Sequence, residues 1–218
     1  MVDLEGDFEP FASAFPNRLV PDVIEMVVRE WPNCTRPTDV PLENRITNRF
    51  VGHLRRQMRN YDRPLFKFSC RPKLADPDAD SELGEIDIEV TSFSNRPDAF
   101  LVLECKRLNV QTESGFASCA GEYVGSGGMG CFISGQYRSA GRIGVMLAYV
   151  MTRSVDDAIK SVDIQLEQHG ATLFMRTPFK LFASTSLPNL PQVKKTSHNL
   201  GDGHFEIIHA FLRYSNTN

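Results

Sequence analysis

The chain has 218 residues, of which 41% are hydrophobic and 23% are charged, and its formal net charge is −3. This composition is ordinary for a globular protein, so we expect a folded core and one sizeable domain rather than a chain without a core. The negative net charge argues against a protein that binds nucleic acid with its whole surface, but it is compatible with a local basic face.

The N-terminal segment and the cysteines bear on the compartment. The first residues, MVDLEGDFEPFASAF, carry acids where a secretory signal has basic residues, and no apolar stretch of the chain is long enough to cross a bilayer. The five cysteines are an odd number and include no CxxC pair. They are typical of reduced thiols rather than of a disulfide framework or a zinc site. We therefore expect a cytoplasmic protein with no membrane association.

The first predicted elements are an irregular arm and two helices. Residues 1–20 are mixed in character and predict the arm. Residues 21–31 predict a short helix, because Pro21 suits a first turn and apolar residues follow at helical spacing. Residues 42–61 predict a second helix with an apolar residue at every fourth position of one stripe. The stripe consists of Leu42, Ile46, Phe50, Leu54 and Met58.

Three strands are predicted next. PLFKFSC (64–70) and the strictly alternating EIDIEV (85–90) are typical of strands, and DAFLVLECKRLNV (98–110) contains a third, AFLVLECK (99–106). A Gly- and Ser-rich segment follows them. It does not form a phosphate-binding loop, because no Gly-Lys-Ser/Thr follows its glycines.

The last part of the chain predicts helices and then strands. We expect one helix at about 131–151 and another over 154–170, with Ser154 as its cap. Residues 171–184 and 204–214 predict two closing strands, and His209 in the second is expected to be a core histidine. The order of elements predicts an α/β fold, with a mixed central sheet flanked by helices in a single domain.

The third strand places an acid and an amine within an apolar run. Alternate residues of a strand share a face, so Glu104 and Lys106 are expected to point to the same side. In EIDIEV the same alternation separates three apolar residues from three acids. The expected apolar face is Ile86, Ile88 and Val90, and the acidic face is Glu85, Asp87 and Glu89.

If these two strands are neighbours, Asp87 lies beside Glu104. Two carboxylates held close together repel each other and gain proton affinity unless a cation lies between them. Carboxylate oxygens are ligands that suit Mg²⁺ or Mn²⁺. Lys106 beside them would orient or activate a water and stabilise negative charge that develops on a phosphate.

This arrangement resembles the PD-(D/E)XK phosphodiesterase superfamily, the restriction-endonuclease-like nucleases, in which an Asp on one strand precedes Glu/Asp-x-Lys on the next. Here sixteen residues separate Asp87 from Glu104-Cys105-Lys106. The resemblance implies that Asp87 and Glu104 bind Mg²⁺ or Mn²⁺, that the backbone carbonyl of Cys105 contributes, and that Lys106 assists the attacking water. Glu43 matches a further acid, a metal-ligand candidate, that many members carry on the helix before the sheet.

The chain also departs from the family pattern. Ile86 precedes Asp87 where the pattern has a proline, and Gln136-Tyr137 does not have the spacing of the helical Gln-xxx-Tyr motif. On the resemblance, residues 1–40 are expected to form an N-terminal arm with a short helix, and residues 41–218 a nuclease-like domain.

The resemblance implies a Mg²⁺-dependent hydrolase that cleaves nucleic acid, with DNA preferred over RNA, in defence against foreign DNA (antiviral defence) or in DNA repair. It also implies a partner protein such as a helicase or an ATPase, or a second copy of the chain as a homodimer. Arg55 and Arg56 on the arginine-rich second helix are the expected phosphate contacts, and a merely solvated helix face is an equal alternative.

Two other hypotheses remain open. The chain is compatible with a nuclease-like fold that has lost catalysis and binds nucleic acid or a partner protein. It is also compatible with an unrelated α/β protein, in which Glu104 and Lys106 form a surface pair. Such a pair contributes only about 0.2–1 kcal/mol to stability. In that case Asp87 and Glu104 would lie far apart or on different faces of the sheet.

Overall fold

The fold is known from a computed structural model, which describes residues 15–36, 42–75, 82–93, 100–137, 142–152, 154–201 and 203–214. Most of the predicted N-terminal arm and the expected domain boundary between residues 40 and 41 lie outside these ranges. Within them, no helix has both the length and the apolar character that a membrane span requires.

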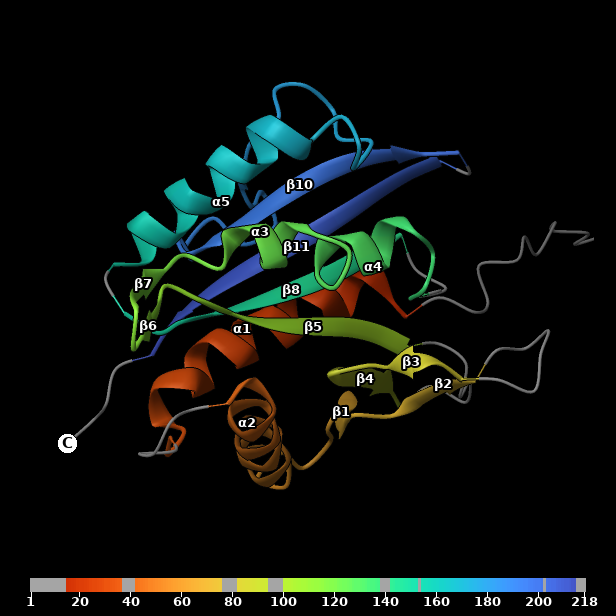
Figure 1. Cartoon of the computed structure of the whole chain (residues 1–218). Coiled ribbons are helices and arrows are strands. Elements are labelled where there is room, and N and C mark those ends of the chain that lie inside the picture. Colours follow the sequence, from red (N-terminus) through yellow and green to blue (C-terminus); the bar gives the residue numbers. More distant parts are fainter. Residues whose placement is uncertain are drawn as a thin grey trace, which may run out of the picture.

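A seven-stranded mixed sheet forms the centre of the molecule, with strand order β1-β4-β5-β8-β11-β10-β9 (Figure 1). β5, β8 and β11 are parallel, and the other neighbours are antiparallel. The strands of this sheet are β1 (Phe66–Cys70), β4 (Ile88–Ser92), β5 (Phe100–Leu108), β8 (Ile143–Val150), β9 (Phe182–Ala183), β10 (Val193–Leu200) and β11 (Gly203–Arg213). Two small hairpins complete the strands, β2 (Lys73–Ala75) with β3 (Glu82–Glu85) and β6 (Val110–Thr112) with β7 (Gly115–Ala117).

Helices cover both faces of the sheet. Figure 1 shows α1 and α2 on one face and α3, α4 and α5 on the other. One apolar cluster lies between the sheet and the first pair, and a second lies between the sheet and the other three. The helices are α1 (Val20–Glu30), α2 (Glu43–Met58), α3 (Ala120–Val124), α4 (Met129–Ile133) and α5 (Val155–His169), and short 3-10 turns, η2 (Asn17–Leu19) and η3 (Trp31–Asn33), flank α1.

The helices predicted from apolar spacing are confirmed. In α2 the stripe residues Ile46, Phe50 and Leu54 are buried against the sheet, because residues four apart lie on one face of a helix. In α5 the hydroxyl of Ser154 accepts a hydrogen bond from the Asp157 N–H at 3.1 Å, which satisfies one of the free donors of the first turn. The predicted α/β fold with a mixed sheet between helices is therefore confirmed at this level.

The helix predicted at about 131–151 is wrong. The segment contains the end of α4, a turn at 134–137, a part outside the described residues, and β8. β8 lies between β5 and β11, and its residues after Ile143 are all buried. Both faces of the strand are therefore apolar, and the sequence shows no alternation of apolar and polar residues. A short, wholly apolar run is compatible with a buried helix or a buried strand. This run forms a strand because it pairs with the parallel strands β5 and β11.

The strand predicted over residues 171–184 is also largely wrong. It contains turns after α5, one isolated bridge between Met175 and His198, and the two-residue β9. The strand that pairs with β11 is β10 instead, and all of β10, from Val193 to Leu200, takes part in the pairing. β10 was not predicted because its sequence, VKKTSHNL, is mostly polar, and two of its polar residues, Thr196 and His198, are buried together with Val193.

Those two residues belong to a buried polar chain beneath α3. His198 Nδ1 donates to the Leu173 carbonyl at 2.7 Å, which leaves its Nε2 to accept from the Thr196 hydroxyl at 2.8 Å. Thr196 then accepts from His209 Nε2 at 3.0 Å, and His209 Nδ1 accepts from the Tyr123 hydroxyl at 2.9 Å. Every member is satisfied only if both histidines are neutral. The prediction that His209 is a core histidine is confirmed.

EIDIEV is not one continuous strand, as predicted, but is broken at Ile86 and Asp87, between β3 and β4. Ile86 packs into the cluster under α3 to α5, whereas Ile88 and Val90 pack on the opposite face, so the expected common face of the three residues is wrong. The broken backbone pairs with the turn after β1, because Arg71 N–H donates to the Asp87 carbonyl at 3.0 Å. The break directs the Asp87 side chain toward β5.

Candidate active site

The candidate site lies where β4 separates from β5. The two strands pair from Thr91↔Phe100 to Ile88↔Leu103, and β5 continues beyond that point. The N–H groups of Cys105 and Arg107 face the vacated side. Asp87 Oδ2 accepts from the first at 2.9 Å and Glu43 Oε2 from the second at 2.9 Å. Within the part of the chain that the structure describes, no strand pairs with β5 on this side, and the two carboxylates take that place, held by backbone donors.

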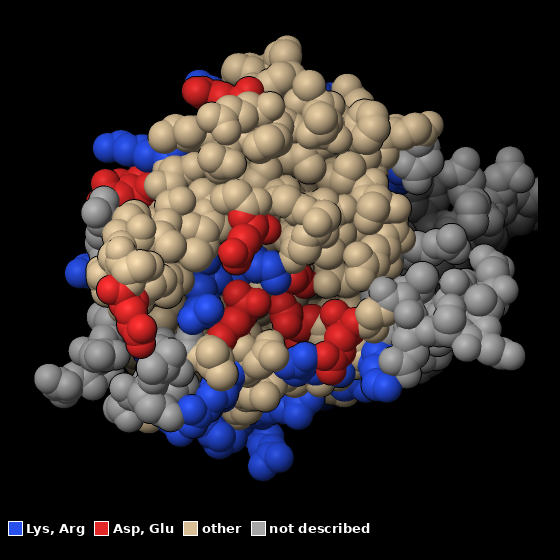
Figure 2. All heavy atoms as spheres, viewed as in Figure 1, with Lys and Arg blue, Asp and Glu red and all other residues tan. Residues whose placement is uncertain are grey.

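Lys106 lies at the centre of this group. Its ammonium Nζ is 2.6 Å from Glu104 Oε1, 3.1 Å from the Cys105 carbonyl oxygen and 3.4 Å from Glu43 Oε1. The structure therefore brings Glu43, Glu104, the Cys105 carbonyl and Lys106 together, and Asp87 is bonded to the backbone of the same residue, Cys105. In Figure 2 acidic and basic side chains gather in a hollow on this face of the molecule.

The thiol of Cys105 takes no part in this group. Its side chain points to the other face of the sheet, where it is buried and its sulfur accepts a hydrogen bond from the Tyr149 hydroxyl at 3.3 Å. Burial raises the pKa of this thiol well above its usual value. Only the backbone of Cys105 is therefore available as a ligand at the edge of β5.

Tyr137 is a member of the site that the sequence did not identify. Its hydroxyl donates to Glu104 Oε2 at 2.6 Å, so both oxygens of this carboxylate are engaged, one by Tyr137 and one by Lys106. Tyr137 follows α4, and its N–H donates to the Cys131 carbonyl at 3.2 Å. The pair Gln136-Tyr137 was visible in the sequence, but its spacing gave no sign that the chain folds back onto Glu104.

Burial dominates the electrostatics of the acids. Glu104 is 4% exposed, and burial together with the nearby Asp87 raises its pKa to about 7, although Lys106 and Tyr137 oppose the shift. Burial also raises the pKa of Asp87 and of Glu43. Burial by itself would lower the pKa of Lys106, but the carboxylates outweigh it and raise that pKa. The group therefore favours a cation among its oxygens.

The donor set fits Mg²⁺ or Mn²⁺. No three His, Cys, Asp or Glu side chains of the described residues form a metal-binding group by themselves. The oxygens of Asp87 and Glu104 and the Cys105 carbonyl are hard ligands, and Mg²⁺ in proteins is bound by one or two carboxylates and keeps several waters. Two of these three donors, Glu104 and the Cys105 carbonyl, already bind a positively charged group, the ammonium of Lys106.

Arg55 and Arg56 do not join the acids. They lie in the last turns of α2, twelve and thirteen residues after Glu43, which corresponds to about 18–20 Å along a helix. Arg55 Nε donates to the Phe68 carbonyl on β1 at 2.8 Å, and both arginines are exposed. Any phosphate contact that they make is therefore to a part of the ligand remote from the acids.

No protein-family model, no curated protein and no solved structure matches the chain. What the site does is therefore inferred from its own residues. Three acids, a lysine and a tyrosine meet at one broken strand edge, and their groups can hold a divalent cation, orient a water and stabilise an anion.

Proposed function

We propose that the protein is a metal-dependent nuclease that hydrolyses phosphodiester bonds, using Mg²⁺ or Mn²⁺, with DNA preferred over RNA. The convergence of Asp87, Glu104, the Cys105 carbonyl and Lys106 at the free edge of β5 carries the proposal. The order of elements supports the restriction-endonuclease-like assignment. α2 precedes the antiparallel strands β1, β4 and β5, and then α3 and α4 lead to β8, which is parallel to β5.

Asp87, Glu104 and the Cys105 carbonyl would hold the metal. A bound Mg²⁺ supplies Lewis-acid chemistry, since it polarises a phosphate and makes a nearby water easier to ionise. The pKa of Glu104, about 7, suits this role. Near neutral pH the carboxyl group is present in both its protonated and its ionised form, and a bound cation would replace the proton.

Lys106 acts on the reacting groups rather than as a ligand. Its raised pKa keeps the amine protonated near neutral pH, so it cannot coordinate a metal and cannot serve as a base. A protonated amine at this position orients the attacking water by donating a hydrogen bond. It also stabilises the negative charge that grows on the phosphate as the bond to the leaving oxygen breaks. Its existing bond to Glu104 keeps the ammonium within reach of the metal ligands.

Cleavage of defined nucleic acids tests the proposal. The purified protein is incubated with single- and double-stranded DNA and RNA, with Mg²⁺, with Mn²⁺ and with EDTA. We expect cleavage with the metals, most of all of DNA, and none with EDTA. Asp87→Asn and Glu104→Gln should each lose it, because an amide supplies no negative charge to a metal.

Glu89→Gln is the matched control. Glu89 is a half-buried acid on β4, two residues beyond Asp87, and burial raises its pKa as well, but it faces Lys67 rather than Lys106. This variant should cleave as the wild type does. Nucleic-acid binding without cleavage under any metal condition would instead favour the hypothesis of an inactive nuclease-like binding subunit.

A further inference from the structure

A second charged feature lies between the last turn of α2 and β1. It is a hollow of about 470 Å³. The described residues that line it include three cations, Arg55, Arg59 and Lys67, and no acid. They also include two exposed aromatic side chains, Tyr61 with 46% and Phe93 with 57% of its surface accessible. We call this hollow, defined by these five residues, the basic groove.

Charge and backbone together indicate what the basic groove accepts. Phe93 N–H donates to the Leu65 carbonyl, so the carbonyl of Phe68, three residues further along β1, points away from β4. Arg55 Nε occupies that carbonyl. An extended peptide that added itself to β1 would need the same group. The contact therefore disfavours a peptide strand, whereas the cations favour a polyanion. Glu89 on β4 balances part of the charge of Lys67 alone.

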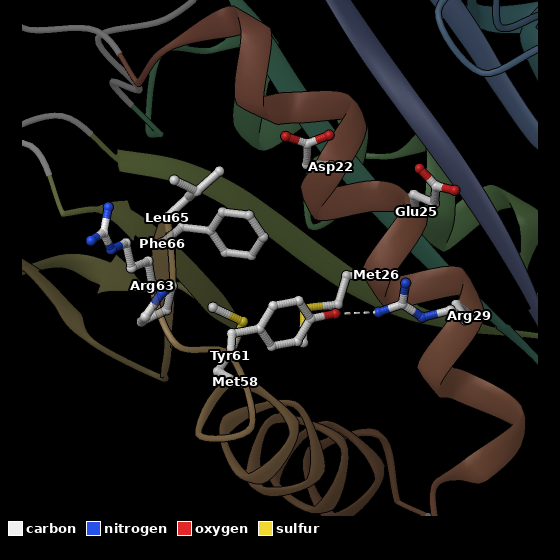
Figure 3. A pocket seen from close by; sticks show the side chains of 10 residues that line it. Asp22, Glu25, Met26, Arg29, Met58, Tyr61, Arg63, Leu65 and Phe66 are labelled. Atoms are coloured by element: carbon white, nitrogen blue, oxygen red, sulfur yellow. Dashed lines mark hydrogen bonds between the residues drawn. The ribbon is translucent and has the colours of Figure 1, made fainter.

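Tyr61 is held in position before any ligand arrives. Arg29 Nη2 donates to its hydroxyl at 2.6 Å, and Figure 3 shows the hydroxyl pointing at Arg29 across the gap between α2 and α1. An aromatic ring that is already fixed loses little conformational entropy when a ligand stacks on it. Beyond Tyr61 lies a neighbouring pocket of about 260 Å³, whose charged lining residues are Asp22, Glu25, Arg29 and Arg63. The two acids there balance the two arginines, whereas the basic groove has three cations and no acid, so the basic groove attracts a nucleic-acid backbone more strongly.

We propose that the basic groove binds single-stranded nucleic acid, with bases stacked on Tyr61 and Phe93 and phosphates against Arg55, Arg59 and Lys67. Every base has an aromatic face, but only a single strand leaves that face open to a side chain. Grooves that combine cations with exposed aromatic rings bind single strands in this way. The inference depends on the proposed nuclease function, because it names the form of nucleic acid that the site receives.

The position of the basic groove agrees with this role. β1 carries Phe66 and Phe68 beside the basic groove, and its last residue, Cys70, lies opposite Ile88, the neighbour of Asp87. Four residues of a strand span about 13 Å. One strand of nucleic acid that lies along β1 therefore reaches from the basic groove to the acids. Figure 2 shows Lys and Arg side chains over α2, below the hollow in which the acidic and basic side chains of the candidate site gather.

Binding measured in EDTA tests the inference, because no metal-dependent cleavage interferes. Fluorescence anisotropy compares a labelled oligothymidylate with a duplex of equal length. The double variant Tyr61→Leu/Phe93→Leu keeps apolar bulk but removes both rings. It should bind the single strand at least about 30-fold more weakly, since two stacking rings are removed and stacking contributes ~1 kcal/mol or more per base. Its duplex binding should not change. Tyr61→Phe keeps the ring but loses the hydrogen bond from Arg29, so it should lose much less single-strand binding than the double variant does.

Phe182→Leu is the matched control. Phe182 is an exposed phenylalanine on β9, at the opposite end of the sheet, and Lys180 Nζ lies 5.6 Å from its ring. It should leave binding unchanged. The inference is overturned if the folded double variant binds the single strand like the wild type, if it loses duplex binding equally, or if Phe182→Leu has the same effect. A wild type that binds through these rings but never cleaves would count against the proposed nuclease and not against the basic groove.

Discussion

The ammonium group of Lys106 lies among the oxygens that a divalent cation would use. It contacts Glu104 Oε1 and the Cys105 carbonyl, and it lies 3.4 Å from Glu43 Oε1. A buried carboxylate without a cation takes up a proton, and Lys106 limits that tendency in Glu104. The same contact also means that the lysine must shift when a metal binds. Lys106 thus stabilises the ionised form of these acids.

Lys106→Met separates catalysis from metal binding. We expect cleavage to fall by at least about 100-fold, which is typical when a group that stabilises transition-state charge is removed. Mn²⁺ affinity, measured by electron paramagnetic resonance, should not decrease, because Glu104 Oε1 and the Cys105 carbonyl are then free of the ammonium. Lys195→Met is the control, since Lys195 forms a comparable pair with Glu206 at 2.9 Å on neighbouring strands. Full cleavage by a folded Lys106→Met protein would exclude the proposed role.

Tyr137 should control the pH at which Glu104 becomes a metal ligand. Its hydrogen bond lowers the pKa of Glu104, against burial and Asp87, which raise it to about 7. Metal needs the ionised carboxylate, so Mn²⁺ affinity should rise with pH up to about 7 and then level off. Without the bond, in Tyr137→Phe, the levelling should move to higher pH. Tyr123→Phe, a buried tyrosine bonded to His209 instead, should leave the profile unchanged. Identical profiles for wild type and Tyr137→Phe would show that the contact does not tune Glu104.

At the level of elements, two features attach helices to the sheet: a chain of buried hydrogen bonds and a close packing contact. The chain through His198, Thr196, His209 and Tyr123 ties β10 and β11 to α3 beneath the apolar cluster. The close contact is between α4 and β8. A Cβ atom at Gly144 of β8 would meet the ring of Phe132 of α4 at 2.5 Å. The first feature holds α3 to strands that are far away in the sequence, and the second holds α4 to the next strand of the chain.

The buried histidines predict a loss of stability in acid. Burial lowers the pKa of His209 to about 3, below its ordinary 6.5, so the unfolded state binds the proton more tightly. Its contribution is therefore complete above pH 6.5 and is lost as the pH falls toward 3. At pH 5 it amounts to a loss of about 2 kcal/mol in the free energy of unfolding. Urea unfolding at pH 5 and pH 7.5 measures this difference.

His209→Gln isolates this contribution. The raised pKa values of Glu104, Asp87 and Glu43 act with the opposite sign, and the lowered pKa of His198 acts with the same sign. The wild-type difference alone is therefore a sum over several groups. The variant should be less stable than the wild type at pH 7.5, but it should lose less on going to pH 5. An equal loss in both proteins would contradict the assignment of a neutral, buried His209.

Gly144→Ala tests the packing of α4 on β8. We expect destabilisation by about 1–3 kcal/mol, because the added methyl group overlaps the buried Phe132 ring and the surrounding core must shift. Urea unfolding measures the change. Gly201→Ala, where an added Cβ meets no atom within 4 Å, should change stability little. Equal stability of the Gly144→Ala and wild-type proteins would show that α4 yields without cost.

For the whole molecule, the two layers of helices meet the same strand at the candidate site. Glu43 comes from α2 on one face of the sheet, whereas Tyr137 follows α4 on the other face. Asp87 comes from the break between β3 and β4, and Glu104 and Lys106 from β5. A cation bound there would therefore link both layers through β5. Anything that binds only the folded state stabilises it.

Metal binding should be visible as thermal stabilisation of the whole protein. Mn²⁺ at about 100 times its Kd should stabilise the wild type by about 2.7 kcal/mol and raise its Tm. Asp87→Asn and Glu104→Gln should show little of this rise, because each removes a ligand, whereas Glu89→Gln should show all of it. Scanning calorimetry with Mn²⁺ and with EDTA measures the shift. An equal rise of Tm in wild type and Asp87→Asn would place the metal elsewhere.

The sequence by itself determined those elements whose pattern is complete within one segment. α2 and α5 follow from apolar spacing and capping, and β5 and β11 follow from runs of buried strand-forming residues. Alternation along β5 also placed Glu104 and Lys106 on one side. The identity of Asp87, Glu104 and Lys106 as candidates came from this local periodicity and from the spacing of the two strands.

The tertiary structure alone decided what depends on partners distant in the chain. β8 is a strand because β5 and β11 flank it, and β10 is a strand because β11 pairs with it despite its polar sequence. Asp87 reaches Cys105 because the backbone breaks beside it, and Tyr137 reaches Glu104 across 33 positions. Contacts of this kind are set by how segments pack, and a short apolar or polar run carries no information about its future neighbours.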